Sequence, residues 1–163
     1  MDNLEEKKKQ IIDFIKKNDL IGLYFEIFYE VKVKDKEGTK EKTLSSFFTK
    51  FVHTFKPEQY CALDNPVKKF LGLSKEGFFV SFIIISEVYA KWSAENRELV
   101  SHIRNRFSEL DTSRKFDHQR ISDLKLLDLI FWRKADKKKK EDDQIKERRK
   151  ATKEANSDSV EAL

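Results

Sequence analysis

The sequence predicts an all-α protein, with a compact helical domain of about six to seven helices and a charged C-terminal tail. Gly (4) and Pro (2) are scarce among the 163 residues, whereas sandwiches, barrels and doubly wound sheets need many tight turns rich in these residues. Phe occurs 14 times, so we expect an aromatic-rich core. The length allows one domain and a tail, which we assign to residues 1–134 and 135–163.

The chain begins with two predicted helices. Asn3 can cap a helix that runs to about Lys17, with apolar residues at helical spacing. The next segment, 20–33, is ambiguous. Its apolar residues recur at helical spacing, but residues 29–34 alternate between apolar and charged side chains, as in a half-exposed strand. The longer pattern favours a helix over this segment.

A charged loop and a third helix are expected next. Residues 34–43 are mostly charged and contain a glycine, which indicates a loop. The third helix is expected to begin at Thr43 or Ser45. It should end before Pro57, because the residue that precedes a proline disfavours the helical region.

A short fourth helix follows a connection over residues 57–63. Either Asp64 or Asn65 can cap this helix, and Pro66 then lies at an early position where its missing N–H is tolerated. Gly72 is expected to end the helix, since glycine readily adopts the left-handed conformation found just after a helix.

Three further helices complete the predicted domain. Ser74 can open the first, which is nearly continuous in apolar residues over 78–92 and is expected to be buried on most sides. The second spans 93–110, a polar loop covers 111–119, and a closing helix covers 120–132. From Arg133 the chain has mixed charge and few apolar residues, so we expect a solvated helix extension that fades into a disordered tail.

Composition excludes several classes of site and partner. The net charge of +5 permits nucleic-acid binding without demonstrating it. The single Cys61 excludes an internal disulfide and a cysteine-based zinc site, and we expect no cofactor or metal. The charged N-terminus lacks a signal-peptide pattern, and the longest apolar run, 77–85, is too short to span a membrane. A reducing cytoplasm is the simplest expected location.

Asp64 is the most chemically suggestive residue, because an acid at a helix start beside lysines suits attack on a sugar carbon in DNA. Breaking a base–sugar bond passes through an oxocarbenium-like state, which a nearby carboxylate stabilises. A lysine can instead attack the sugar and form a Schiff base, and Lys50 is the candidate. Two interpretations of Asp64 stay open, a helix cap alone and a site residue that also caps. Lys50 is equally explained as a solvated helix lysine.

The segment 62–73, ALDNPVKKFLGL, is similar to the pattern of the helix-hairpin-helix (HhH-GPD) DNA glycosylase superfamily. In that family a catalytic aspartate follows a short apolar approach and opens a helix that ends near Gly-Leu. Residues 49–55, TKFVHTF, look like the second helix of the hairpin. Residues 120–132 resemble the closing helix of compact proteins with the 8-oxoguanine DNA glycosylase-like fold. The hairpin is degenerate, because residues 44–48 lack the glycines whose N–H groups bind a DNA phosphate in the family.

The resemblance implies roles for individual residues. Asp64 matches the catalytic aspartate, and Lys50 falls near the catalytic lysine of the 8-oxoguanine-type branch. Lys68 and Lys69 match the basic face of the family's helix. Apart from the resemblance, His53 and Arg104 are further candidates for contact with DNA. Each of these lysines and Arg104 is more simply explained as a solvated charge, and His53 as a residue that hydrogen-bonds on its helix face.

Three functions follow as alternatives. The leading prediction is a DNA-glycosylase-like protein that binds duplex DNA, with excision of a damaged or modified base through Asp64 left open, with or without lyase activity. The second is a non-catalytic DNA- or protein-binding module of the same fold, for example in phage defence or counter-defence. The third is a helical interaction protein with no nucleic-acid role. The charged tail is a candidate for contact with a protein partner, and no membrane contact is expected.

Overall fold

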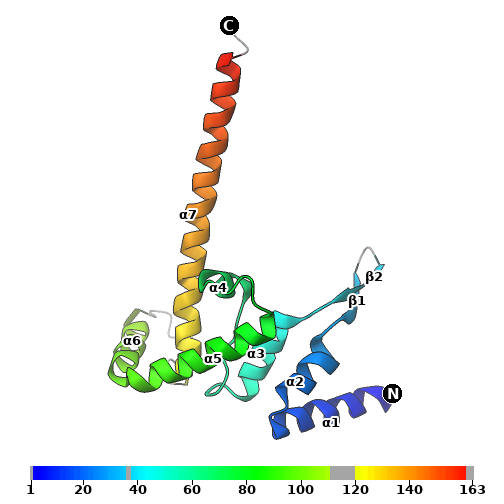
Figure 1. The fold of residues 1–163 in the computed structure, drawn as a ribbon. Helices are drawn as coiled ribbons and strands as arrows, with labels where there is room; N and C mark the ends of the chain where they lie inside the picture. Colours follow the sequence, from blue (N-terminus) through cyan, green and yellow to red (C-terminus); the bar gives the residue numbers. More distant parts are fainter. Residues whose placement is uncertain (1, 36–37, 111–119, 161–163) are drawn as a thin grey trace.

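The chain is mainly helical, as its composition predicts. The computed structural model describes residues 2–35, 38–110 and 120–160, which form seven α-helices, one π-helical segment and one β-hairpin (Figure 1). In chain order the elements are α1 (Asp2–Lys17), α2 (Leu20–Leu23), the π-helical η1 (Tyr24–Phe28), β1 (Val31–Asp35), β2 (Gly38–Lys42), α3 (Ser45–Phe55), α4 (Asn65–Phe70), α5 (Phe78–Glu95), α6 (Arg97–Leu110) and α7 (Asp123–Val160).

The segment 20–33 is helical only in its first part. α2 and η1 carry the helical conformation as far as Phe28. Glu30 then takes a positive φ of 51°, a left-handed conformation that a continuing right-handed helix does not allow. The expectation of one helix through residue 33 is therefore wrong from residue 29 onward, and from residue 31 the strand-like alternation decides the structure.

β1 and β2 form an antiparallel hairpin with Val31 opposite Lys42. The backbone N–H of Leu44 donates to the carbonyl of Phe28 at 2.8 Å, which closes the base of the hairpin. The loop expected over 34–43 is thus wrong for the strand residues, whereas Thr43 is irregular as expected and residues 36 and 37 lie outside those that the structure describes.

The core is built around α3 and is rich in aromatic side chains, as the phenylalanine content predicts. Phe48 is fully buried, and its ring lies 4.9–5.5 Å, centroid to centroid, from those of Tyr24, Phe28 and Phe82. These rings come from η1 and α5, so α3 is held between the N-terminal elements and the long apolar helix. Other fully buried apolar side chains are Leu23, Val52, Leu63, Val67 and Leu126.

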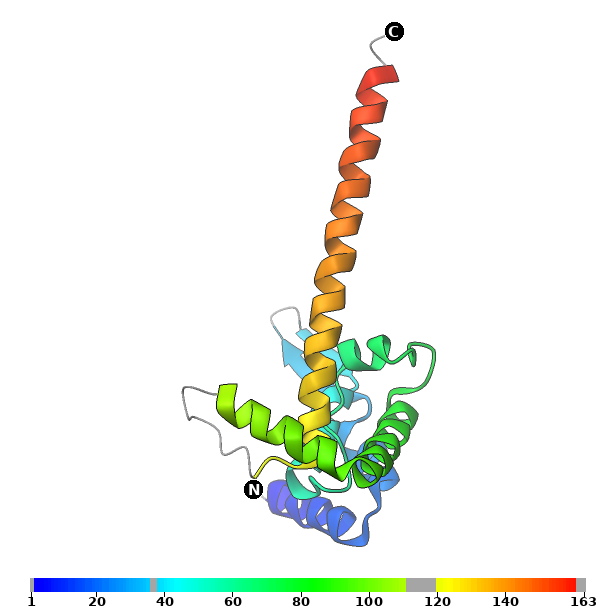
Figure 2. The same ribbon diagram turned by 90° about the vertical axis from the view of Figure 1, so that its left-hand side faces the viewer.

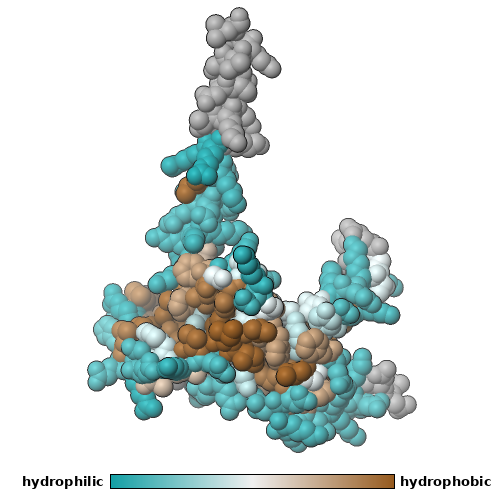
Figure 3. Space-filling view, in the orientation of Figure 1, coloured by the Kyte–Doolittle hydropathy of each residue, from teal (hydrophilic) through white to brown (hydrophobic). Residues whose placement is uncertain are grey.

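α5 is apolar on both its buried and its exposed sides. Phe82 and Ile85 lie in the core, whereas Val80, Ile84 and Val88, spaced by four residues, are 41–56% exposed. The prediction that this helix is buried on most sides is thus only partly confirmed. Figure 3 shows apolar side chains gathered over α5 and a mainly hydrophilic surface on α7 where it leaves the domain. None of the described helices is apolar over a length that could cross a bilayer.

α7 forms one wall of the domain and then leaves it. The hydroxyl of Ser122 accepts the backbone N–H of Lys125 at 3.2 Å, a capping contact that fixes where this helix begins. α4 and α5 both pack against the first part of α7. Beyond the domain, α7 projects away in both views and continues to Val160 (Figures 1 and 2). The loop expected at 111–119 lies outside the described residues.

Candidate functional site

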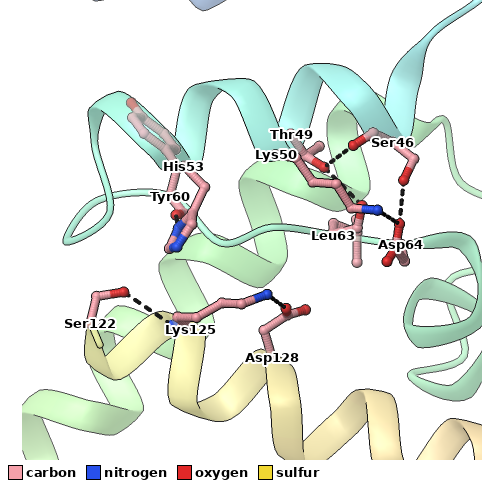
Figure 4. Close-up of polar contacts among 10 residues, drawn as sticks. All are labelled: Ser46, Thr49, Lys50, His53, Tyr60, Leu63, Asp64, Ser122, Lys125 and Asp128. Carbon is pink, nitrogen blue, oxygen red and sulfur yellow. Dashed lines mark hydrogen bonds and ion pairs between the residues drawn. The ribbon is translucent and has the colours of Figure 1, made fainter. Parts of the chain in front are cut away.

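The structure brings Lys50 and Asp64 into contact. Ser46 and Lys50 lie one turn apart on the same face of α3, because residues four apart on a helix are neighbours. Lys50 Nζ lies 3.0 Å from Asp64 Oδ1, and the Ser46 hydroxyl donates to the same oxygen (Figure 4). Both described contacts are to Oδ1, so Oδ2 remains as an acceptor for water or a ligand. The Lys50 side chain is 54% exposed and that of Asp64 is 25% exposed, so the pair is open to solvent.

Asp64 stands at the N-cap position of α4 without capping the helix through its side chain. Its φ of −115° and ψ of 154° are those of extended backbone, and its carboxylate makes no hydrogen bond to the first N–H groups of α4. Pro66 also removes one N–H that a cap would otherwise satisfy. The carboxylate is turned toward α3 instead. Helix capping therefore does not account for an aspartate at this position.

Two further contacts hold the connection that carries Asp64 against α3. The hydroxyl of Thr49, which is fully buried, donates to the carbonyl of Leu63 at 2.8 Å. His53 Nδ1 lies 2.7 Å from the carbonyl of Tyr60, which requires Nδ1 to carry a proton because a carbonyl only accepts. These contacts fix both ends of the segment that precedes Asp64. His53 therefore has a structural contact in addition to the DNA contact predicted for it, which stays a prediction.

α7 supplies a second charged pair, which faces the first across the space between α3 and α7. Lys125 Nζ lies 2.7 Å from Asp128 Oδ2 (Figure 4). Asp128 is buried, with 5% of its surface exposed. Burial raises the pKa of Asp128, and the charge of Asp64 raises it further, whereas Lys125 and His53 lower it. Figure 4 shows His53, Lys50 and Asp64 on one side of this space and Lys125 and Asp128 on the other.

Sequence reasoning missed this pair. Asp128 lies on the apolar stripe of the closing helix, between Leu124 and Phe131 at helical spacing. An acid on a stripe that packs into a core is a signal of a paired or functional group, because an unpaired buried charge is costly. This signal can be read from the sequence, whereas the identity of the residues that face Asp128 in the fold cannot.

The other predicted DNA contacts lie in different settings. Lys68 is buried, and its ammonium donates to the carbonyl of Glu76 at 2.5 Å. Arg104 is mostly buried and pairs with Asp123 Oδ1 at 2.5 Å, which ties α6 to the start of α7. Lys69 is exposed on α4. The structure thus gives Lys68 and Arg104 contacts that support the fold, and their contact with DNA stays a prediction.

Cys61 lies close to Asp64 in sequence but is unsuited to act as a nucleophile. Its backbone N–H donates to the Ser86 hydroxyl at 3.0 Å, and that hydroxyl lies 3.4 Å from the Cys61 sulfur. Burial raises the pKa of Cys61 to about 12, so the thiol stays protonated at neutral pH. Within the described ranges, no three His, Cys, Asp or Glu side chains form a group that could bind a metal.

Comparison with known proteins returned no matching family model, curated protein or solved structure. The resemblance of residues 43–73 to the glycosylase superfamily therefore stays a prediction, and the functional argument depends on the geometry of the site.

Proposed function

We propose that this chain is a DNA-glycosylase-like protein that binds duplex DNA and excises a damaged or modified base through Asp64. The observation that carries the proposal is the contact between Lys50 Nζ and Asp64 Oδ1 at 3.0 Å, on a surface that solvent reaches. The two candidates named from the sequence come from different elements, and the fold places them together. A carboxylate turned away from its own helix toward a lysine is consistent with a chemical role.

Asp64 is suited to the water route of base excision. When the C1′–N bond of a nucleotide breaks, the electron pair leaves with the base and positive charge develops on the sugar. The Asp64 carboxylate stabilises that charge, and Oδ2 takes a proton from the water that attacks C1′. General-base assistance of this kind contributes on the order of 10²- to 10⁴-fold in rate. Ser46 and Lys50 hold the other oxygen, which fixes the orientation of the carboxylate.

Lys50 offers a second route. Its amine can attack C1′ after losing a proton, and Asp64 is the adjacent acceptor for that proton. The departing base takes the electron pair of the C1′–N bond. The C1′–O4′ bond then breaks as the sugar ring opens, O4′ keeps its electron pair and takes a proton, and the amine nitrogen and C1′ form a Schiff base. This route carries lyase activity, whereas the water route does not.

Base release by the purified full chain tests the proposal. Duplexes that carry damaged or modified bases are incubated with the protein, and strands made sensitive to alkali are measured. Asp64→Asn should abolish the signal while its helical circular dichroism remains. Asp13→Asn, at an exposed position on α1, removes the same charge and should keep full activity. Equal activity in Asp64→Asn and the wild type would reject the assignment.

Borohydride trapping distinguishes the two routes. A covalent protein–DNA adduct that is lost in Lys50→Met would support the lysine route. The matched control is Lys91→Met, an exposed lysine on α5 that also pairs with a carboxylate, Glu95, at 4.0 Å. Base release without any adduct would leave only the water route.

The runner-up is a non-catalytic module of the same fold that binds DNA or protein. The observation that favours it is the absence of glycine from residues 44–48, where the family places the N–H groups that hold a DNA phosphate. DNA binding without base release would support this alternative, with phage defence or counter-defence as the setting. Base release would instead support hydrolase activity in DNA repair. In either case we propose a cytoplasmic location, in keeping with a free, buried Cys61.

A further inference from the structure

The Lys125–Asp128 pair is more than the fold requires. Asp128 is buried, and its carboxylate is held by a lysine one turn earlier at 2.7 Å. Replacing a buried ion pair with well-packed apolar residues is often neutral or stabilising, so such a pair is weak evidence of a contribution to stability. Leu124 and Leu127 on the same helix already supply apolar packing to the core. The charges therefore call for an explanation outside packing.

The placement of the pair connects it with the site proposed above. Figure 4 shows Lys125 and Asp128 on α7, facing His53, Lys50 and Asp64 across the space between α7 and α3. The groups that act on Asp128 come from each side, with Lys125 on its own helix, His53 on α3 and Asp64 at the start of α4. Asp128 in turn acts on Cys61 and on Tyr89 of α5. Asp128 is thus enclosed, whereas Lys125, with a 34% exposed side chain, is open to solvent.

Lys125 has donors to offer a ligand. An ammonium group carries three N–H donors, and among the described residues Asp128 Oδ2 is the side-chain acceptor that it contacts. An ammonium that is fixed by a buried carboxylate and open on its other side suits an oxyanion. In DNA the oxyanion beside every sugar is the backbone phosphate, which lysine binds as a point charge.

We propose that Lys125 contacts a DNA backbone phosphate next to the nucleotide at Asp64, and that Asp128 is the positioning residue that fixes the Lys125 ammonium there. This inference rests on the proposed function, since it assumes that DNA is the ligand. It adds a phosphate contact on α7, in a chain whose residues 44–48 lack the glycines that serve this purpose in the resembled family.

The salt dependence of DNA binding tests the inference. The probe is a duplex with a tetrahydrofuran abasic analogue, and affinity for the full chain is measured by fluorescence anisotropy between about 50 and 200 mM salt. Lys125→Met should reduce the slope of log affinity against log salt by about 1, because one phosphate contact is lost. Lys91→Met removes the same charge at an exposed position on α5 and should leave the slope close to that of the wild type.

Asp128→Asn distinguishes the two roles of Asp128 by whether DNA binding becomes stronger or weaker. Removal of a negative charge would strengthen DNA binding if the charge acted only through the overall field. If Asp128 positions Lys125, the variant should bind more weakly than the wild type, with a slope close to that of Lys125→Met. The double variant Lys125→Met, Asp128→Leu replaces the pair with apolar residues and should fold stably while binding like Lys125→Met.

An unchanged slope of log affinity against log salt in Lys125→Met, or tighter DNA binding by Asp128→Asn, would overturn the inference. In that case base release by the wild type, and loss of base release in Asp64→Asn, would still support the proposed function. The expected slope changes without any base release would support the inference and reject excision. Failure of the wild type to bind the duplex at low salt would overturn both.

Discussion

The hydroxyl of Thr49 holds the segment that carries Asp64, and its removal should have a measurable effect on stability. Thr49→Val keeps the shape of the side chain and deletes the donor. The hydroxyl donates to Leu63 O at 2.8 Å in a fully buried position, so the variant leaves that carbonyl without this partner. An unsatisfied buried acceptor costs about 1–3 kcal/mol, and we expect the free energy of unfolding to fall by that amount.

Thr54 provides the matched control on the same helix. Its hydroxyl donates to Lys50 O at 2.9 Å, but its side chain is exposed, so water replaces the lost contact in Thr54→Val. We expect a change within about 0.5 kcal/mol for this variant. Urea unfolding followed by circular dichroism measures both. A Thr49→Val variant as stable as Thr54→Val would refute the idea that this hydroxyl fixes the connection.

Three further predictions concern the core and its titratable groups. Phe48→Ala should lower the free energy of unfolding by about 3–5 kcal/mol in urea titrations, whereas Phe47→Ala, at a neighbouring position that is 60% exposed, should change it far less. Because burial raises the pKa of Cys61 to about 12, a thiol reagent at pH 8 should label the denatured chain and leave the folded chain almost unlabelled, and fast labelling of folded protein would contradict its burial. Burial also raises the pKa of Asp128, so the folded chain binds the carboxyl proton of Asp128 more tightly than the unfolded chain does. Protonation of Asp128 therefore stabilises the fold below the ordinary aspartate pKa of about 3.9. This contribution is lost as the pH rises through the raised pKa. The stability of Asp128→Asn relative to the wild type should therefore increase with pH across that window in urea titrations, and a constant difference would contradict the prediction.

Local patterns in the sequence predict most helices because apolar spacing decides them. α3, α4 and α5 begin and end close to the expected residues, with Gly77 as the N-cap of α5 where Ser74 was expected to open the helix. The hairpin was missed because its strands are five residues each, and the longer helical pattern before them competes for the same segment. The bond from Leu44 N to Phe28 O, which closes the hairpin, joins residues that a local window does not pair.

In the candidate site, too, the sequence indicates the residues, whereas their contacts depend on the tertiary structure. Lys50 and Asp64 were named from the sequence, and the structure places them in contact, although their catalytic role stays a prediction. The local preference of an aspartate before Asn65-Pro66 is to cap its helix. In the structure the Asp64 carboxylate instead contacts Ser46 and Lys50 of α3, which are tertiary partners. A local sequence pattern does not predict this orientation of the Asp64 side chain, because it depends on how the connection before α4 packs against α3.

α3 is the element on which the geometry of the site depends. Thr49, Lys50 and His53 lie within five consecutive residues of α3, and they contact Leu63, Asp64 and Tyr60 respectively. Catalytic groups on a rigid helix keep a fixed geometry only if the facing segment is equally fixed. Thr49→Val therefore separates two explanations of the Lys50–Asp64 contact. If the tether sets the contact, base release should fall in this variant although Thr49 touches no substrate. If the ion pair forms by itself, the variant should lose stability and keep its activity at temperatures where it is folded.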